Sequence, residues 1–166
     1  MRITTLAEYG VICALHLAQR AGEGPITGRE IADLERLPAD YVEQILIRLR
    51  RAGLVRSTRG ARGGYAPARP ATEISIRNVI EASETTTFDL HCVSHPVGEE
   101  RCSSSHTCSI RPVWMLLQRK IDDVLDGVRL SDLLAEESVV RTRVGLATTP
   151  EGSGPAPDAR ALPVLQ

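Results

Sequence analysis

The sequence is poor in aromatic residues and in long hydrophobic runs, and its first 80 residues contain no lysine. Aromatic side chains make up 3% of the 166 residues, so the core must be mainly aliphatic. Charged residues interrupt every apolar run, and none approaches the roughly 20 residues that a membrane span needs. The N-terminal stretch lacks the basic, apolar and cleavage regions of a signal peptide. We therefore expect a cytoplasmic protein without a membrane partner, whose thiols are kept reduced.

Charge is distributed unevenly along the chain. Residues 1–80 carry 12 basic and 8 acidic side chains, a net +4, whereas residues 81–166 carry 8 and 13, a net −5. All basic residues of the first half are arginines, whose planar fork suits phosphate groups and the guanine edge. A GC-rich genome also raises the arginine content, so composition alone leaves both explanations open. The asymmetry indicates a polyanionic partner for the first half only.

Hydrophobic periodicity in the first 83 residues predicts a mainly helical domain with one β-hairpin. Thr5 and Glu8 fit a capping box at the start of the first helix, and Thr27 and Glu30 fit one at the start of the second. The expected elements are a helix from Thr5 to before Gly22, a short helix from Thr27 that buries Ile31 and Leu34, a helix from Pro38 to Gly53, strands at 54–57 and 64–68, and a short helix at 75–83.

The second half of the chain has a different organisation. Residues 84–110 show no clear periodicity and are interpreted as a loop. A broad apolar stripe predicts a long helix at 112–126, which is too apolar to stand free and which a two-fold pairing would bury. A last short helix is expected at 131–137, and the Pro-, Gly- and Ala-rich tail is expected to be disordered. The expected divisions are therefore a mainly helical domain with one hairpin at 1–83, a cysteine-bearing loop at 84–110, a dimerisation helix with a short terminal helix at 111–143, and a tail at 144–166.

The order helix, short helix, turn, helix and hairpin is that of a winged helix-turn-helix, in which the third helix lies in the major groove of DNA. The predicted third helix has one apolar face and an opposite stripe of long polar side chains. A solvated polar face explains the stripe alone, but the hairpin turn adds arginines among glycines that let the backbone approach phosphates. The expected DNA contacts are Thr27, Arg29, Tyr41, Gln44, Arg48, Arg51, Arg59, Arg62, Gly63, Gly64 and Tyr65.

Three of the four cysteines lie in the predicted loop. Cys92, Cys102 and Cys108 are spaced C-x9-C-x5-C. In a reducing compartment such a group favours a metal over disulfides, and thiolates bind iron–sulfur clusters or zinc. Cys108 precedes the predicted long helix, whose N-terminus favours the thiolate form. Cys13 instead lies on the apolar face of the first helix, which predicts a buried core thiol.

Five segments of the chain carry a recognisable pattern. They are Met1–Thr5, Tyr41–Gln44, Leu49–Val55, the wing Arg59–Tyr65 with its pattern RG-x-x-GGY, and Ile74–Ala82. With these segments the chain resembles the IscR/NsrR-type winged-helix regulators of the Rrf2 superfamily over about residues 1–135. The resemblance implies a homodimer that binds a palindromic operator. Arg62 stands where many members have glycine, and its charge offers one more phosphate contact.

The resemblance also implies an iron–sulfur cluster on the three loop cysteines, although the first gap here is longer than is typical. In IscR-like members a histidine three residues after the last cysteine also binds the cluster, but this chain has Arg111 there. In NsrR-like members an acidic residue from the first helix of the partner subunit completes a [4Fe–4S] cluster, and Glu8 occupies that position. A related [2Fe–2S] regulator adds a histidine one turn later, where this chain has Ile12. A [4Fe–4S] cluster is therefore favoured over [2Fe–2S].

Several alternatives stay open. Glu8 is needed only as a cap in the competing interpretation, and His91, His95 and His106 are rival ligands. The predicted function is a transcription repressor whose operator affinity follows a cluster that senses redox state, nitric oxide or iron. The alternative is a zinc-bound or thiol-redox regulator without a cluster. The sequence shows no Ser/His/Asp set, phosphate loop or paired carboxylates in a plausible arrangement, so we do not expect an enzyme.

Overall fold

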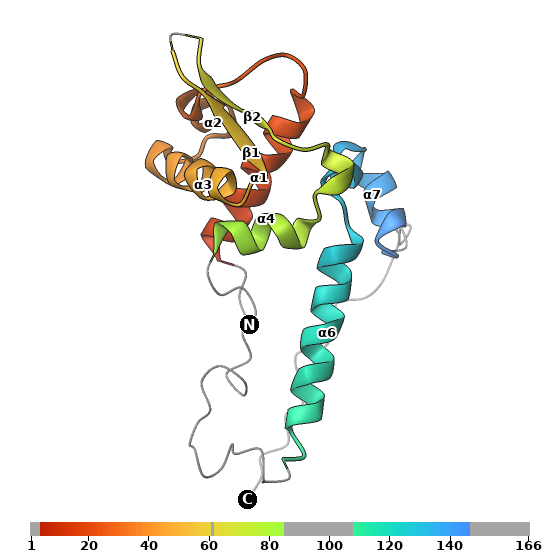
Figure 1. The fold of residues 1–166 in the computed structure, drawn as a ribbon. Coiled ribbons are helices and arrows are strands. Elements are labelled where there is room, and N and C mark those ends of the chain that lie inside the picture. Colours follow the sequence, from red (N-terminus) through yellow and green to blue (C-terminus); the bar gives the residue numbers. More distant parts are fainter. Residues whose placement is uncertain (1–3, 61, 85–107, 147–166) are drawn as a thin grey trace, which may run out of the picture.

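The computed structural model describes residues 4–60, 62–84 and 108–146. The N-terminal elements and the last short helices form a body, and helix α6 extends from it as an arm (Figure 1). In chain order the elements are α1 (Thr5–Gln19), α2 (Gly28–Glu35), α3 (Ala39–Arg51), β1 (Val55–Thr58), β2 (Gly64–Pro67), the 3-10 helix η1 (Ala71–Glu73), α4 (Ile76–Ser83), α6 (Arg111–Gly127), the 3-10 helix η2 (Leu130–Leu134) and α7 (Glu137–Arg143).

The core of the body is aliphatic and centres on α1, which packs against α3, α4 and η2. The apolar positions expected in α3 from their helical spacing are all buried. Each of them stabilises the fold by about 1.5–3 kcal/mol relative to an exposed side chain. They are Val42, Ile45, Leu46 and Leu49, all with no exposed surface.

Helix α1 begins differently from the sequence expectation. The N-cap is Thr4, whose Oγ1 accepts a hydrogen bond from the backbone N–H of Ala7 at 3.4 Å. A carboxylate oxygen of Glu84, far along the chain, accepts from the same N–H at 3.1 Å. The expected capping box of Thr5 and Glu8 is therefore wrong. The Glu8 side chain is exposed, and its carboxylate makes no hydrogen bond to any residue that the structure describes.

Helix α2 starts as expected, with Thr27 Oγ1 accepting from the N–H of Glu30 at 3.1 Å. Ile31 is buried, but Leu34 is 57% exposed, so the expectation that Leu34 faces the core is wrong. The buried face of this short helix is centred on Gly28, Ile31 and Ala32. Leu34 lies about 100° round the helix from the centre of that face, where no element covers it.

The hairpin forms the only sheet in the described residues. Strands β1 and β2 pair antiparallel, from Val55 opposite Pro67 to Thr58 opposite Gly64. The chain before α2 joins this hairpin, because the backbones of Ile26 and Tyr65 exchange hydrogen bonds of 2.9 and 2.7 Å. A Cβ on Gly64 would lie 2.4 Å from the Ile26 carbonyl oxygen, so this close approach requires glycine.

After α6 the chain returns to the body and is fixed there by its backbone. The N–H of Ile76 donates to the carbonyl of Val128 at 3.0 Å, and the N–H of Leu130 donates to that of Ile74 at 2.8 Å. Leu130 is buried. Instead of one helix at 131–137, η2 precedes α7. After α6 the backbone is extended at Val128 and Arg129, and Arg129 pairs with Ser75 in a β-bridge. Most of the predicted loop and almost all of the predicted tail lie outside the described residues.

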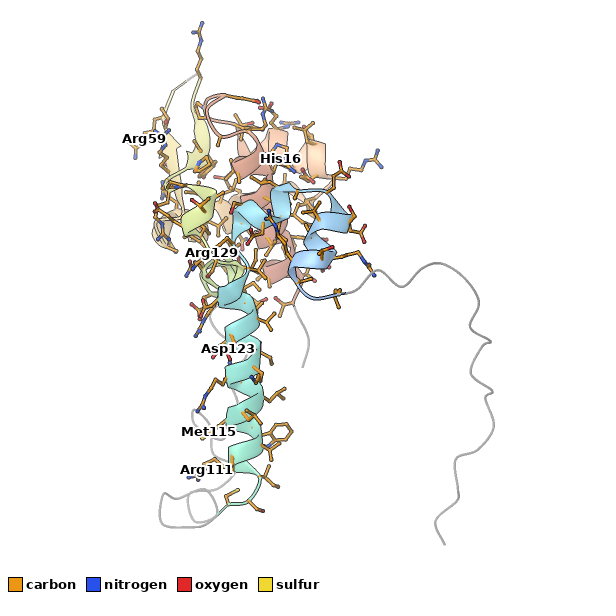
Figure 2. All side chains as sticks on the ribbon, turned by 90° about the vertical axis from the view of Figure 1, so that its right-hand side faces the viewer. His16, Arg59, Arg111, Met115, Asp123 and Arg129 are labelled. Atoms are coloured by element: carbon orange, nitrogen blue, oxygen red, sulfur yellow. The ribbon has the colours of Figure 1, made fainter. Side chains whose placement is uncertain are left out.

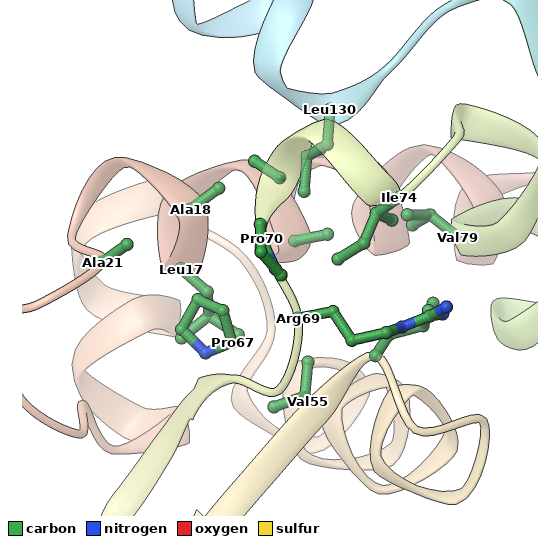
Figure 3. Close-up of a pocket in the computed structure, with 13 residues that line it drawn as sticks. Leu17, Ala18, Ala21, Val55, Pro67, Arg69, Pro70, Ile74, Val79 and Leu130 are labelled. Atoms are coloured by element: carbon green, nitrogen blue, oxygen red, sulfur yellow. The ribbon is translucent and has the colours of Figure 1, made fainter.

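A small apolar cavity of about 50 Å³ lies between α1, the base of the hairpin and the segment that leads to α4 (Figure 3). Leu17, Val55, Val79 and Leu130 are among its walls, and Arg69 is the one charged residue in its lining. No helix in the described part of the chain is long and apolar enough to cross a bilayer.

Candidate nucleic-acid interface and sensor region

One edge of α3 is tied to the hairpin. The hydroxyl of Tyr65 in β2 donates to a carboxylate oxygen of Glu43 at 2.7 Å. Arg50 donates to the Ser57 hydroxyl in β1 at 3.2 Å. Burial raises the pKa of Tyr65 to about 12, and the bond to Glu43 adds to the rise, so the phenol stays a donor. These contacts fix the orientation of the hairpin relative to α3.

The opposite edge of α3 is tied to α1 and α4. The rings of Tyr41 and Tyr9 meet edge to face, with centroids 6.2 Å apart. Arg48 is half-buried, and its guanidinium donates to the backbone carbonyl of Ser83 at 2.6 Å. The sequence placed Tyr41 and Arg48 in one exposed stripe with Gln44 and Arg51. In the structure, Tyr41 and Arg48 instead contact other residues of the same chain, Tyr9 and Ser83.

The face between these edges is free. Gln44 and Arg51 are exposed there, and Arg59 projects from the hairpin away from the body (Figure 2). Several exposed arginines of α2, α3 and the hairpin turn have no acidic partner among the residues that the structure describes. They are Arg29 beside the exposed Thr27 at the start of α2, Arg51 in α3, and Arg59 and Arg62 in the hairpin turn.

The hairpin turn depends on its glycines. The N–H of Gly63 donates to the carbonyl of Gly60 at 2.9 Å. A Cβ on Gly63 would lie 2.3 Å from the carbonyl oxygen of Thr58. Arg59 and Arg62 therefore stand on a tight, narrow turn with little side-chain bulk between them and an approaching duplex.

The expected metal ligands are only partly in view. Cys108 is half-buried and lies three residues before α6 begins at Arg111. Cys92, Cys102, His91, His95 and His106 lie outside the described residues. No group of three or more metal-binding side chains occurs in the described part of the chain. Helix α6 begins at the far end of the arm, whereas α1, which carries Glu8, belongs to the body (Figures 1 and 2).

Residues 3–136 match the model of the Rrf2 family, which is described as an iron-dependent transcriptional regulator. The chain belongs to the Rrf2 family. It is similar to IscR of Aliivibrio salmonicida, with 33% identity over 84% of this chain and 80% of that one. The structure of IscR from T. potens shares 34% identity and a TM-score of 0.67 over 83% of this chain and 90% of that one. The structure of CymR, the global cysteine regulator of B. subtilis, shares 31% identity and a TM-score of 0.66 over 80% of this chain and 95% of that one.

These likenesses confirm the resemblance and the fold class that the sequence predicted: a mostly helical winged-helix protein with one hairpin. The Rrf2 chain is a DNA-binding transcriptional regulator of the IscR type, and its relatives are regulators rather than enzymes.

Helix α6 of this Rrf2 protein is anchored at its C-terminal end, and no described element outside α6 packs on its N-terminal half. Arg77 of α4 pairs with Asp126 at 2.9 Å and with Glu81 at 2.6 Å. Toward the N-terminal end, large apolar side chains are 40–60% exposed along the arm. They are Val113, Trp114, Met115, Leu116 and Leu117.

Two buried groups in α1 belong to the core. Cys13 has no exposed surface, which confirms the expected core thiol, and burial together with the charge of Glu35 raises its pKa to about 12. His16 is buried one turn later, and its Nδ1 lies 2.5 Å from a carboxylate oxygen of Glu35 in α2. Helical spacing places His16 on the same face of α1 as Cys13, but no local signal in the sequence indicates its partner.

Proposed function

We propose that this Rrf2 regulator is a homodimeric repressor of a palindromic operator, with an iron–sulfur cluster as its sensor. The observation that carries the DNA-binding part is the free face of α3. It presents Gln44 and Arg51, and the hairpin that Tyr65 and Arg50 tie to α3 carries Arg59 and Arg62 in its turn. All four side chains are exposed. In this arrangement α3 enters the major groove and the hairpin follows the backbone.

The roles of the contacts follow from their chemistry. Gln44 suits a bidentate contact to adenine, and Arg51 suits guanine or phosphate. Thr27 and Arg29 stand at the start of α2, where free backbone N–H groups favour a phosphate. Arg59 and Arg62, together with Gly63, Gly64 and Tyr65, form the wing that holds the sugar-phosphate chain.

Salt dependence of binding tests this assignment. DNA selected on the protein from a random pool serves as the operator, and fluorescence anisotropy gives the affinity at several salt concentrations. Each phosphate contact contributes roughly 0.9 to the slope of log affinity against log salt. Because each substitution is present in both subunits of the proposed dimer, Arg59→Ala and Arg62→Ala should each reduce the slope by about two. Unchanged slopes in both variants would remove the wing from the interface.

The exposed apolar surface of α6 supports a dimer. The arm buries its base against α4 but leaves five large side chains in water near its start. A helix this apolar is stable in solution when a second copy covers it, and a two-fold axis lets the same face serve both subunits. Such pairing also sets the distance between the two α3 helices, which must match one turn of DNA.

The donor set fits an iron–sulfur cluster. Cys92, Cys102 and Cys108 supply three thiolates, and Glu8 is a free, exposed carboxylate because Thr4 and Glu84 cap α1 in its place. Within one chain the start of α6 and the body lie apart, which favours Glu8 of the partner subunit as the fourth ligand. A bound [4Fe–4S] cluster would supply an iron centre that reacts with oxidants and nitric oxide.

Glu8 is also well placed to pass a signal to DNA. It precedes Tyr9, whose ring packs against Tyr41 at the start of α3. A constraint on Glu8 therefore acts on α1, which packs against α3, the helix that enters the major groove in this proposal. When that constraint is lost, the spacing of the two α3 helices shifts and operator affinity changes.

Anaerobic purification with visible spectra and iron and sulfide counts tests the cofactor. Glu8→Ala should lose cluster occupancy and alter DNA affinity, whereas Glu23→Ala, an exposed glutamate past the end of α1, serves as the control. Full occupancy with unchanged affinity in Glu8→Ala would refute the ligand assignment. A colourless protein that contains zinc, or one that contains no metal but has reactive thiols, would favour the alternative regulator. The likeness to a cysteine regulator, CymR, supports that second candidate.

A further inference from the structure

The end of α4 is a tightly built junction. Ser83, its last residue, has no exposed surface, and its hydroxyl donates to the carbonyl of Val79 at 2.8 Å. The carbonyl of Ser83 belongs to the last turn of α4, whose carbonyl groups have no N–H donor within the helix and carry partial negative charge. Arg48 of α3 donates to this carbonyl at 2.6 Å. Its cation therefore caps α4 from outside, in a charge-assisted bond.

Helix α1 enters the same junction. The carboxylate of Glu84 accepts from the N–H of Ala7 at 3.1 Å. Gly10 of α1 lies directly on Ser83, because a Cβ at Gly10 would come within 2.0 Å of the Ser83 hydroxyl oxygen. Helices α1, α3 and α4 thus meet at Ser83 and Glu84. Because these contacts are tightly packed, a movement of one helix should displace the other two (Figure 1).

The junction lies close in the sequence to the expected cysteine ligands. Cys92, the first of the three expected thiolate ligands, follows Glu84 by eight residues. The chain that leads to the cysteines therefore leaves the body directly from the residues that hold α3 and α1. Ser83 and Glu84 are the last described residues before this chain, and Arg48 joins Ser83 to the middle of α3.

We infer that Arg48 is a positioning residue that couples the cysteine segment to the reading helix, and that it makes no contact with DNA. This inference rests on the proposed sensing function. Arg48 lies in the same stripe of α3 as Gln44 and Arg51, but its guanidinium is engaged on Ser83. Releasing that bond frees α3 from the end of α4, so that ligation or loss of ligation at the cysteines no longer changes the angle of α3.

The test compares operator affinity of cluster-loaded and cluster-free protein by fluorescence anisotropy over a range of salt concentrations. In Arg48→Gln the ratio between the two states should fall to below about twofold, while the salt slope of the cluster-free protein stays at the wild-type value. Arg51→Gln, which changes an exposed arginine on the free face of α3, is the matched control. It should lower affinity equally in both cluster states, because Arg51 lies on the free face of α3 and takes no part in the junction. Arg48→Lys, which keeps a charged donor, should retain part of the ratio.

The outcomes separate the two ideas. If wild-type protein binds equally in both states, the proposed sensing function fails and the coupling fails with it. If wild-type protein shows a ratio that Arg48→Gln preserves, or if Arg48→Gln reduces the salt slope by about two, the coupling is wrong and the sensing function stands. Should Arg48→Gln fold poorly in circular dichroism, Arg48→Met, which keeps a long side chain but removes the donor to Ser83, takes its place. Its ratio must also fall below about twofold, and a preserved ratio overturns the inference.

Discussion

Replacing Gly10 with alanine should separate α1 from α4. The new Cβ would lie 2.0 Å from Oγ and 2.8 Å from Cβ of Ser83, a residue with no exposed surface and no room to retreat. Alanine in a helix interior gains up to about 1 kcal/mol over glycine. Overpacking of a buried contact costs about 1–3 kcal/mol and sometimes more. Because both clashing atoms belong to a buried residue, the clash should exceed the gain, with a net loss of about 1–2 kcal/mol.

Urea and thermal unfolding at one fixed protein concentration measure this loss, because dimer stability depends on concentration. At about 2–4 °C per kcal/mol, the midpoint should fall by about 2–8 °C. Gly127→Ala is the matched control, because a Cβ there meets nothing within 4 Å. Adding Ser83→Gly to Gly10→Ala removes both clashing atoms and should recover part of the loss. A Gly10→Ala protein as stable as the wild type would refute the close packing on which the junction rests.

Three further predictions follow from single contacts. Tyr65→Phe removes the donor to Glu43 and should weaken operator binding several-fold without changing the salt slope, and anisotropy that shows a lower slope would contradict this. Cys13, with its pKa raised to about 12 by burial, should resist iodoacetamide at pH 8.5 until urea unfolds the protein. Since the folded state holds this thiol neutral, its contribution to stability is intact below pH 9 and is lost as the pH rises toward 12, which a comparison with Cys13→Ala measures. Val55→Ile adds a methylene at the wall of the 50 Å³ cavity and should stabilise the protein by up to about 0.8 kcal/mol, and a lower melting temperature would contradict it.

Local periodicity was sufficient to predict which residues of α3 are buried. Val42, Ile45, Leu46 and Leu49 follow helical spacing, and all four are buried because a single face of α3 meets α1, α2 and α4. The hairpin was predictable for a similar reason, since its glycine-rich turn permits a tight reversal that other residues oppose. Patterns that act within one element can be read from the sequence of that element.

Features that depend on distant residues were missed or misplaced. The sequence offers two adjacent threonines at the start of α1, and Glu84, 77 residues after Ala7, helps to select Thr4 as the cap by supplying a second acceptor. Leu34 has the right character for a core residue, but the short α2 is centred on another face and nothing packs over it. In both cases the deciding neighbour lies outside the local sequence pattern.

Arg48 and Arg51 show what such a neighbour changes. Both arginines belong to one polar stripe at helical spacing, and nothing in α3 itself distinguishes them. Ser83, 35 residues after Arg48, binds the first and leaves the second in water. The surface of α3 that is free to read DNA is therefore narrower than the stripe, because its two edges serve to hold the helix. Base discrimination should then concentrate in Gln44 and Arg51, whereas substitutions at the edges should change how the two reading helices are oriented and hence affect all operator sequences alike.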